Sequence, residues 1–465
     1  TVDRELDELL TVAPAVAIDG PKGVGKTDTA QRRAETVWML DDAAQRAVLG
    51  ADFTLSALPS GTVLLDEWQK VPQLWDAVRR QVDSGSEPGR FLLTGSATPV
   101  DAAGTHSGAG RILSLRMRPM GLHERGLTSP SVSLEGLLSG TSERIEGSTR
   151  FALLDYATAI VASGFPGIMG LEPRLRRRML DAYLQRIIDR DLAELGFHVR
   201  RPETLRRWLA AYAAASSTTT AYSKLLDATT GGDGAQPAKT TTITYRDHLS
   251  QLWMLDPIPG WSRAAGGIRR LQQAPKHQLA DPALAARLMN LSEASLVTPA
   301  GAHAVGSLFE SLVSLGVRVM AQALEARVSH LRLDSGSREV DLIVEGPDGQ
   351  ILGIEVKLAP DVTAHDVRHL LWLREQMPDR VVPPCPRNNQ CRWQGEHLLK
   401  SFVTLHQPQI RIIDRKRLRD QVQAGLGHFF GACLVLWHVF PRPDHVVCTA
   451  RRQEFAPIRR LVTIC

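Results

Sequence analysis

Cysteine is missing from the first 384 residues of this 465-residue chain. The five cysteines all lie further on, and their spacing matches neither the usual zinc patterns nor a redox pair. The first 380 residues are therefore interpreted as a cytosolic, cysteine-free body, followed by a tail of different composition. The cysteines are Cys385, Cys391, Cys433, Cys448 and Cys465.

Long apolar runs and internal repeats are also lacking. No run is expected to span a bilayer, and the first ten residues, TVDRELDELL, are acidic and polar, unlike a signal peptide. Hydrophobic residues make up 43% of the chain and charged residues 23%, as in ordinary soluble proteins. The sequence predicts a cytoplasmic protein of two to four domains with no membrane partner.

A general excess of positive charge is absent from the body. The net charge of +5 arises after residue 380, where 13 Lys and Arg face 5 Asp and Glu. Residues 1–380 carry a net charge of −3. Global charge therefore gives no reason to assign DNA binding to the body, although DNA stays a candidate partner.

The strongest motif is GPKGVGKT at residues 20–27, which fits the phosphate-loop pattern G-x-x-x-x-G-K-[ST] without a mismatch. An apolar run, residues 13–19, precedes it and a helix-forming segment follows, which is the context that the motif requires. Backbone N–H groups would cradle the phosphates of ATP, Lys26 would neutralise their charge and Thr27 would ligate Mg²⁺. The predicted nucleotide-binding residues are Gly20, Pro21, Lys22, Gly23, Val24, Gly25, Lys26 and Thr27.

Two carboxylates end a second apolar run, VLLDE. Asp66 is predicted to hold Mg²⁺, and Glu67 to polarise the attacking water. The alternative, a pair of helix-capping carboxylates, is disfavoured because the strand before them is unbroken and apolar.

Three further residues are candidates for the catalytic step. Thr94 or Ser96, at the end of the predicted strand 89–98, would contact the γ-phosphate or the water; an ordinary turn is the alternative. Arg111 is a candidate arginine finger acting on a neighbouring subunit of a homo-oligomer, with a plain surface residue as the alternative.

The rest of the chain divides by composition. Strands at 37–42 and 61–69 and a helix in PQLWDAVRRQVDSG complete an α/β domain over residues 1–125, with a parallel sheet covered by helices on both faces. Residues 126–150 are predicted to be a linker, residues 151–300 to be helical and residues 301–380 to be α/β again. Three helices within 204–256 fit a winged-helix core or plain helical packing.

These segments, in this order, resemble the bacterial and archaeal AAA-type ATPases that are joined to a C-terminal domain of unknown function. The resemblance rests on GPKGVGKTDTA, VLLDEWQKVPQLWDAVRRQVD, FLLTGSATP, GRILSLRMRPMGLHE, GFPG and REVDLIVEGPDGQILGIEVKLA, and covers residues 1 to about 380. It implies an ATP site at residues 20–27, Asp66 and Glu67, a helical or winged-helix centre and a restriction-endonuclease-like end. Asp28 stands where such loops often carry a second hydroxyl.

The segment REVDLIVEGPDGQILGIEVK predicts a hairpin centred on Asp348, with Asp341 opposite Glu355 and Glu339 opposite Lys357. With Glu310 from the preceding helix, Asp341, Glu355 and Lys357 fit the D…E-x-K core of PD-(D/E)XK nucleases, in which carboxylates hold a divalent metal. A charged hairpin face with Glu–Lys pairing is the alternative, and a nuclease-like domain that only binds partners is another.

The leading functional hypothesis is an AAA-type ATPase, requiring ATP and Mg²⁺, that couples nucleotide state to a nuclease-like domain. The alternatives are an ATP-switched DNA-binding regulator and a non-enzymatic, antitoxin-like interaction protein. For residues 381–465 two explanations stay open. One is an added basic module; the other, favoured by the cysteine distribution, is a change of reading frame near residue 383.

Overall fold

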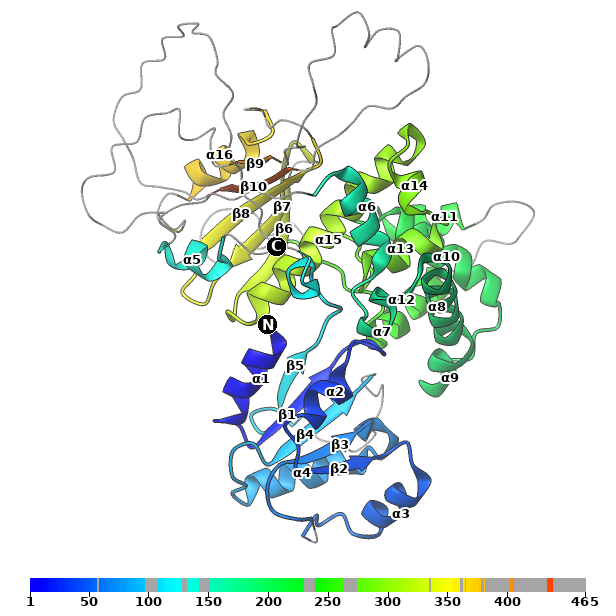
Figure 1. Cartoon of the computed structure of the whole chain (residues 1–465), viewed down its shortest axis with the longest axis vertical. Coiled ribbons are helices and arrows are strands. Elements are labelled where there is room, and N and C mark those ends of the chain that lie inside the picture. The colour runs from blue at the N-terminus through cyan, green and yellow to red at the C-terminus, as the bar shows by residue number, and fades with distance from the viewer. Residues whose placement is uncertain are drawn as a thin grey trace, which may run out of the picture.

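The computed structural model places three parts one after another along the chain, coloured from blue to orange in Figure 1. An α/β part comes first, a helical part follows, and a second sheet with its helices comes last. The residues that the structure describes are 1–56, 58–96, 108–127, 132–141, 151–229, 239–261, 274–333, 336–359, 363, 365–377, 380, 402–404 and 433–437.

The first sheet is parallel throughout, with the strand order β2-β3-β4-β1-β5. Its central strands are short apolar runs, as expected for a sheet buried on both faces. Chain-order neighbours β3 and β4 lie side by side, and β1 lies between β4 and β5. The strands are β1 (Ala15–Asp19), β2 (Thr36–Met39), β3 (Val63–Asp66), β4 (Phe91–Gly95) and β5 (Leu113–Arg116).

Helices cover both faces of this sheet. Alternate residues of β1 point to opposite sides, so Ala15 and Ala17 join one core cluster with Leu74, while Val16 and Ile18 join another. The predicted α/β fold with helices on both faces is confirmed. The helices of this part are α1 (Val2–Leu10), α2 (Lys26–Gln31), α3 (Ala43–Ala51), η1 (Trp68–Lys70), α4 (Gln73–Asp83) and η2 (Leu122–Arg125).

The central part is helical, and a π-helical turn, η3, interrupts it at Ile187–Asp191. The three helices predicted within 204–256 are α10, α11 and α12, but residues 230–238 between the last two lie outside the described residues, and a winged helix is not shown. The helices are α6 (Leu153–Ala162), α7 (Pro166–Met169), α8 (Pro173–Arg186), α9 (Leu192–Glu194), α10 (Pro202–Ala214), α11 (Tyr222–Ala228), α12 (Lys239–Gln251), α13 (Pro282–Leu288), α14 (Glu293–Leu296) and η4 (Pro299–Gly301).

The second sheet is antiparallel, in the order β6-β7-β8-β10-β9. The predicted hairpin register is confirmed: Leu342 lies opposite Ile354 and Glu345 opposite Ile351, and one step further this register sets Asp341 opposite Glu355. The elements are α15 (Ala302–Gln322), β6 (Arg327–Leu333), β7 (Arg338–Glu345), β8 (Ile351–Lys357), α16 (Arg368–Gln376), β9 (Phe402–Thr404) and β10 (Cys433–Trp437).

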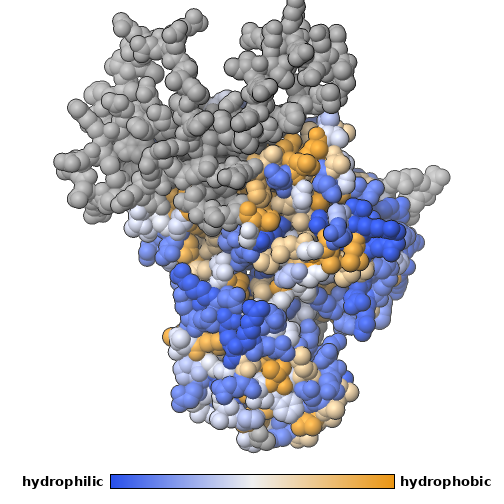
Figure 2. All heavy atoms as spheres, in the orientation of Figure 1, coloured by the Kyte–Doolittle hydropathy of each residue, from blue (hydrophilic) through white to orange (hydrophobic). Residues whose placement is uncertain are grey.

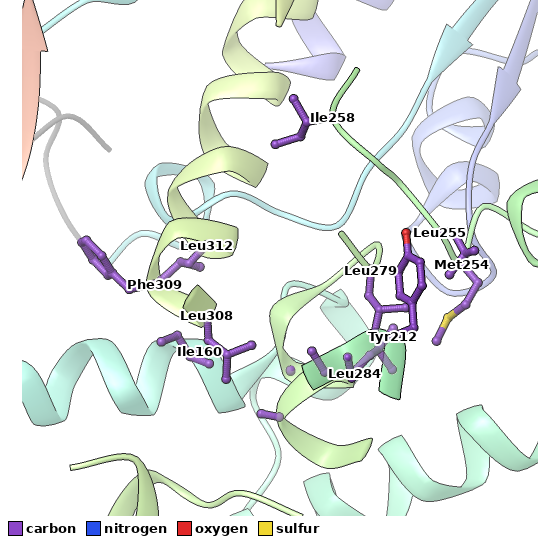
Figure 3. Packing of buried hydrophobic residues seen from close by; sticks show 14 of the residues in the cluster. Ile160, Tyr212, Met254, Leu255, Ile258, Leu279, Leu284, Leu308, Phe309 and Leu312 are labelled. Carbon is purple, nitrogen blue, oxygen red and sulfur yellow. The ribbon is translucent and has the colours of Figure 1, made fainter. Parts of the chain in front are cut away.

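One continuous core joins the three parts. It runs from Val24 in the phosphate loop, through the central helices, to Leu342 and Ile354 of the second sheet. Figure 3 shows its middle, where Leu308 and Leu312 of α15 lie near Ile160 of α6, and Leu284 of α13 lies among residues from neighbouring segments. Movement in one part is therefore opposed by close packing in the next.

Helix α15 differs from the sequence expectation in one respect. With η4 it forms a stretch, Pro299–Gln322, that is long and apolar enough to cross a membrane, and 61% of its apolar 18-residue stretch is buried inside the protein. On the face shown in Figure 2, the described residues form a surface in which small hydrophobic areas lie between hydrophilic areas. A helix buried in the core of a protein meets the same criterion of length and composition.

Several boundaries also differ from prediction. The predicted linker 126–150 contains helix α5 (Leu134–Ser139), whose Leu134, Leu137 and Leu138 are buried. Nine of the polar first ten residues form helix α1, whose Leu6 is buried against the sheet. Beyond residue 380, β10 pairs with β8, so backbone after the predicted boundary belongs to the second sheet. The side-chain packing that would test the reading-frame hypothesis lies outside the described residues.

Candidate functional site

The phosphate loop connects β1 to α2, with three glycines in left-handed or related backbone conformations. Gly23 has a φ of 80° and Gly25 a φ of 97°, values that side chains with a Cβ rarely adopt. At Gly20 a Cβ would collide with the carbonyl oxygen of Met117, which directly follows β5. The loop therefore requires glycine both for its turns and for its approach to the neighbouring strand.

Lys26 lies inside this loop with only 5% of its surface exposed. Its Nζ donates to the carbonyl oxygens of Gly20 at 2.8 Å and Pro21 at 2.9 Å. Burial lowers the pKa of Lys26 to about 8, although Glu67, Asp19 and Asp66 act against the shift. The present partners of the ammonium are carbonyl oxygens, which carry no net charge. Phosphate oxygens of a bound nucleotide would give it negatively charged partners instead.

Asp66 ends β3, and two hydroxyls contact it. The Thr27 hydroxyl donates to Asp66 Oδ1 at 2.7 Å, and the hydroxyl of Thr94, from the neighbouring strand β4, donates to the same oxygen. Thr27 and Asp66 are the residue types that hold Mg²⁺ beside a nucleotide, and they lie within reach of a common ion. Thr94 contacts the proposed magnesium carboxylate, so it is one step removed from the phosphate or water predicted as its partner.

Glu67 is held by polar neighbours on both oxygens. Its backbone adopts a φ of 56°, and its Oε1 accepts from the Ser96 hydroxyl at 2.8 Å. Gln69 Nε2 donates to the other oxygen, Oε2. Ser96 therefore contacts the proposed base, whereas the sequence hypothesis gave it a direct contact with phosphate or water.

Arg111 lies apart from this group. Its Nε pairs with Asp83 Oδ1 at 2.9 Å, and 48% of its side chain is exposed. Within one chain it contacts a helix rather than the phosphate loop, so a role as an arginine finger on a second subunit stays a prediction. Asp28 also points away from the loop interior and pairs with Arg32 one helical turn later.

The central part contributes contacts that the sequence did not indicate. Lys22 Nζ lies 2.7 Å from Asp191 Oδ1 and 3.4 Å from Glu194 Oε2, at the end of the π-helical turn. Phe165 lies against the loop, 3.9 Å from the position of a Cβ on Gly23. The phosphate loop is thus bordered by residues of the helical part as well as by its own sheet.

A second cluster of charges lies in the C-terminal sheet, where Glu310, Asp341, Glu355 and Lys357 come together as predicted. Lys357 Nζ donates to Glu355 Oε1 at 2.7 Å and lies 4.0 Å from Asp341 Oδ2. Asp341 Oδ2 also accepts from the Val356 N–H at 2.9 Å. The predicted partner of Lys357 across the hairpin, Glu339, instead accepts from Arg332 of β6 at 2.9 Å.

Lys276 is the member of this cluster that the sequence did not reveal. It precedes α13 and is 1% exposed, and its Nζ lies 2.8 Å from Glu310 Oε1 and 3.0 Å from Asp341 Oδ1. A single lysine followed by His277 and Gln278 gave no signal, because its partners are 34 and 65 residues away.

Burial and these contacts decide the ionisation of the cluster. Burial raises the pKa of Glu310 to about 8, and Asp341 adds to the shift. Burial likewise raises the pKa of Glu355 to about 8, with Asp341 again adding and Lys357 opposing. Burial acts to raise the pKa of Asp341, but Lys276 and Lys357 outweigh it and lower that pKa. Asp341 is therefore the anion that the two ammonium groups share.

A divalent metal, which the nuclease resemblance implies, does not fit this arrangement. Among the described residues, no group of three His, Cys, Asp or Glu side chains is placed to hold a metal ion. The space between Glu310 and Asp341 holds an ammonium group. A nuclease-like core is therefore not shown, and no step is assigned to a metal at this position.

Comparisons with known proteins divide the chain in three. Residues 12–125 match the model of an AAA domain, residues 153–295 a domain of unknown function (DUF8612), and residues 305–402 another domain of unknown function (DUF4143). The last match extends past residue 382, where the resemblance was expected to fade.

Related proteins and solved structures match this chain at low identity. The uncharacterized protein Rv2008c of Mycobacterium tuberculosis is 26% identical over 74% of this chain and 70% of its own length, as is Mb2031c of Mycobacterium bovis. Among solved structures, the Walker-type ATPase paby2304 of Pyrococcus abyssi aligns with 62% of this chain and 94% of its own, at 16% identity and a TM-score of 0.36. The ORC2 protein of Aeropyrum pernix, solved as ADPNP–ADP complexes, aligns with 67% and 93%, at 16% identity and a TM-score of 0.26.

The match over residues 12–125 coincides with the parallel sheet, the phosphate loop and the carboxylates described above. Residues 12–125 of this chain therefore form an AAA-type, P-loop nucleotide-binding domain.

Proposed function

We propose that the protein hydrolyses ATP with Mg²⁺ and that its nucleotide state is transmitted through the helical part to the C-terminal sheet. The observation that carries the proposal is the placement of Asp66 and Glu67 at the carboxyl end of β3. There Asp66 contacts Thr27 of the loop and Glu67 contacts Ser96, which directly follows β4.

The roles of the residues follow from their chemistry. The backbone N–H groups of residues 20–27 bind phosphate oxygens, and Lys26 exchanges its two carbonyl partners for them. Thr27 and Asp66 hold Mg²⁺, which screens the phosphate charge when bound. Glu67 accepts a proton from the attacking water, and Ser96 and Gln69 hold its carboxylate in position.

Transmission to the rest of the chain is supported by contacts on two sides of the AAA-type domain. Beside the loop, Lys22 pairs with Asp191. At the end of β5, Arg116 pairs with Asp256, and so does Arg118 two residues later. Asp256 follows α12 and also pairs with Arg318 of α15. A shift of the loop or of β5 on nucleotide binding therefore meets charged partners in the helical part and in α15.

ATP turnover by two variants tests the proposal. Lys26→Ala removes the ammonium that binds phosphate, so nucleotide binding should be lost. Glu67→Gln keeps the shape of the side chain but removes the base, so ATP should bind and hydrolysis should fall by roughly 10²- to 10⁴-fold. Binding is measured with a fluorescent ATP analogue and turnover by phosphate release. Normal turnover by Glu67→Gln would refute the role given to Glu67.

A further inference from the structure

The Glu310–Asp341–Glu355 cluster already contains a positive charge at its centre. Lys276 reaches it from outside the sheet, and its Nζ lies within 3.0 Å of one oxygen from each of two carboxylates, Glu310 and Asp341. It also lies 3.7 Å from Glu339 Oε1. A buried ammonium with several carboxylate neighbours takes the place that a metal ion takes in an acidic site.

Geometry makes this ammonium and a metal ion mutually exclusive. Divalent ions bind carboxylate oxygens at about 2.0–2.6 Å, so an ion shared by Glu310 and Asp341 would overlap the Nζ of Lys276. The charges agree with exclusion, because the ammonium groups of Lys276 and Lys357 already face Asp341, the anion that they share. Adding a divalent ion without losing Lys276 would place further positive charge beside a buried cation.

The backbone around Lys276 is fixed, which distinguishes it from a lysine on a mobile loop. Its N–H and C=O both bond to Ile258, each at 2.9 Å, and the next residue, His277, bonds Ser217 and Thr218. Five residues further on, Asp281 accepts from the Gly164 N–H, beside the phenylalanine that lies against the phosphate loop. The backbone of segment 276–281 is therefore anchored on three sides, at Ile258, at residues 217–218 and at Gly164, and this holds Lys276 beside the cluster.

We propose that Lys276 is the resident cation of the C-terminal carboxylate cluster and that, while in place, it excludes divalent metal from Glu310, Asp341 and Glu355. The C-terminal domain then works without a metal at this cluster, as a binding or transmitting domain. The inference goes beyond ATP hydrolysis and does not depend on it.

Calorimetric titration of the nucleotide-free protein with Mn²⁺ tests this, because Mg²⁺ binding at the phosphate loop is tied to nucleotide. The wild type and Asp341→Asn should behave alike, with no site that depends on Asp341. Lys276→Met removes the ammonium and leaves a side chain of similar length. It should gain one Mn²⁺ site per chain and a rise of a few degrees in Tm with Mn²⁺, and the added Asp341→Asn change should abolish both.

Lys357→Met is the matched control, since it removes the other lysine of the cluster and leaves Lys276 in place; it should gain no Mn²⁺ site. If Lys276→Met does not fold, the double variant Lys276→Met/Glu310→Gln removes one charge of each sign and should bind Mn²⁺ through Asp341 and Glu355. An Asp341-dependent Mn²⁺ site in the wild type would overturn the proposal. So would the absence of such a site in a folded variant that lacks Lys276.

Discussion

The ammonium of Lys22, in the phosphate loop, lies 2.7 Å from the carboxylate of Asp191, in a π-helical turn of the next part of the chain. Asp191 is 4% exposed. π-Helical turns are rare in proteins, and those that occur often lie at functional sites. A charged side chain of the nucleotide loop is therefore bound to an irregular, buried turn. Through this pair, a change in the loop on nucleotide binding would alter the conformation of the turn.

Hydrogen exchange across residues 187–194 should change when nucleotide binds, because the loop that donates Lys22 reorganises around the phosphates. In Lys22→Met the pair with Asp191 is lost. We expect this variant still to bind ATP through Lys26 and the backbone, while the nucleotide-dependent change in exchange at 187–194 disappears.

Arg190→Ala is the control for this experiment. Its side chain is 71% exposed. Among the described residues it pairs only with Glu194, one helical turn further on. It should keep the nucleotide-dependent change. A Lys22→Met protein whose exchange at 187–194 responds to nucleotide as in the wild type would exclude the pair as the connection.

Ser96→Ala should lower kcat by roughly tenfold with little change in KM, since it removes a hydrogen bond that orients Glu67 and leaves the phosphate loop, residues 20–27, unchanged. Steady-state phosphate release measures both constants. A rise in KM at constant kcat would instead favour the direct contact with phosphate that the sequence suggested.

Asp256 should be among the most sensitive positions for stability. It is buried, which by itself raises its pKa, but Arg118, Arg318 and Arg116 outweigh burial and hold that pKa well below its usual range. Asp256→Asn leaves three arginines without their shared anion, at a cost of about 3–5 kcal/mol in the free energy of unfolding.

The sign of the pH dependence follows from the lowered pKa. Because the carboxyl is more acidic in the folded state, its contribution is present above the unfolded pKa near 3.8 and is lost as the pH falls below it. The difference in Tm between wild type and Asp256→Asn should be constant from about pH 7 to pH 5 and shrink below about pH 4. The control, Asp181→Asn, removes a half-exposed partner of Arg287 and should cost less than about 0.5 kcal/mol.

Two glycine substitutions should act in opposite directions. In Gly20→Ala the new methyl group collides with the Met117 carbonyl, a backbone atom that cannot turn away, so we expect a loss of about 1–3 kcal/mol and weaker nucleotide binding. In Gly50→Ala, inside α3, nothing lies within 4 Å of the new Cβ. This variant should be more stable by about 0.5–1 kcal/mol, with unchanged nucleotide binding, in urea unfolding and fluorescence titration.

The sequence predicted the features that local pattern encodes. Apolar runs located β1, β3 and β4, the glycine motif located the phosphate loop, and the PDG turn set the register that brings Asp341 opposite Glu355. Strand β5 was missed because its LSLR is short and half polar.

The structure revealed ion-pair partners that lie far apart in the sequence. Three charged side chains are buried by residues that lie far away in the sequence, namely Asp191, Asp256 and Lys276. Lys22 and Asp191, for example, are 169 residues apart. Periodicity within a window carries no information about such pairs, so the connections between the three parts could not be predicted.

The last prediction concerns the segment after residue 380, for which an added module and a change of reading frame were both proposed. Backbone from this segment forms β10, which covers the edge of β8 between Gly353 and Lys357. Deleting it should leave ATP hydrolysis intact, because the phosphate loop and its partners all precede residue 200. The same deletion uncovers the N–H and C=O groups of a strand whose side chains are mostly buried, and such an edge pairs with other chains.

We therefore expect a chain ending at residue 380 to hydrolyse ATP at the wild-type rate but to aggregate at lower concentration. A chain ending at residue 437, which keeps β10, is the matched control and should stay dispersed. Phosphate release and light scattering distinguish the two effects. If both truncations remained equally dispersed and equally stable to heat, β10 would contribute nothing to the second sheet, and the change of reading frame would be the better explanation of the tail.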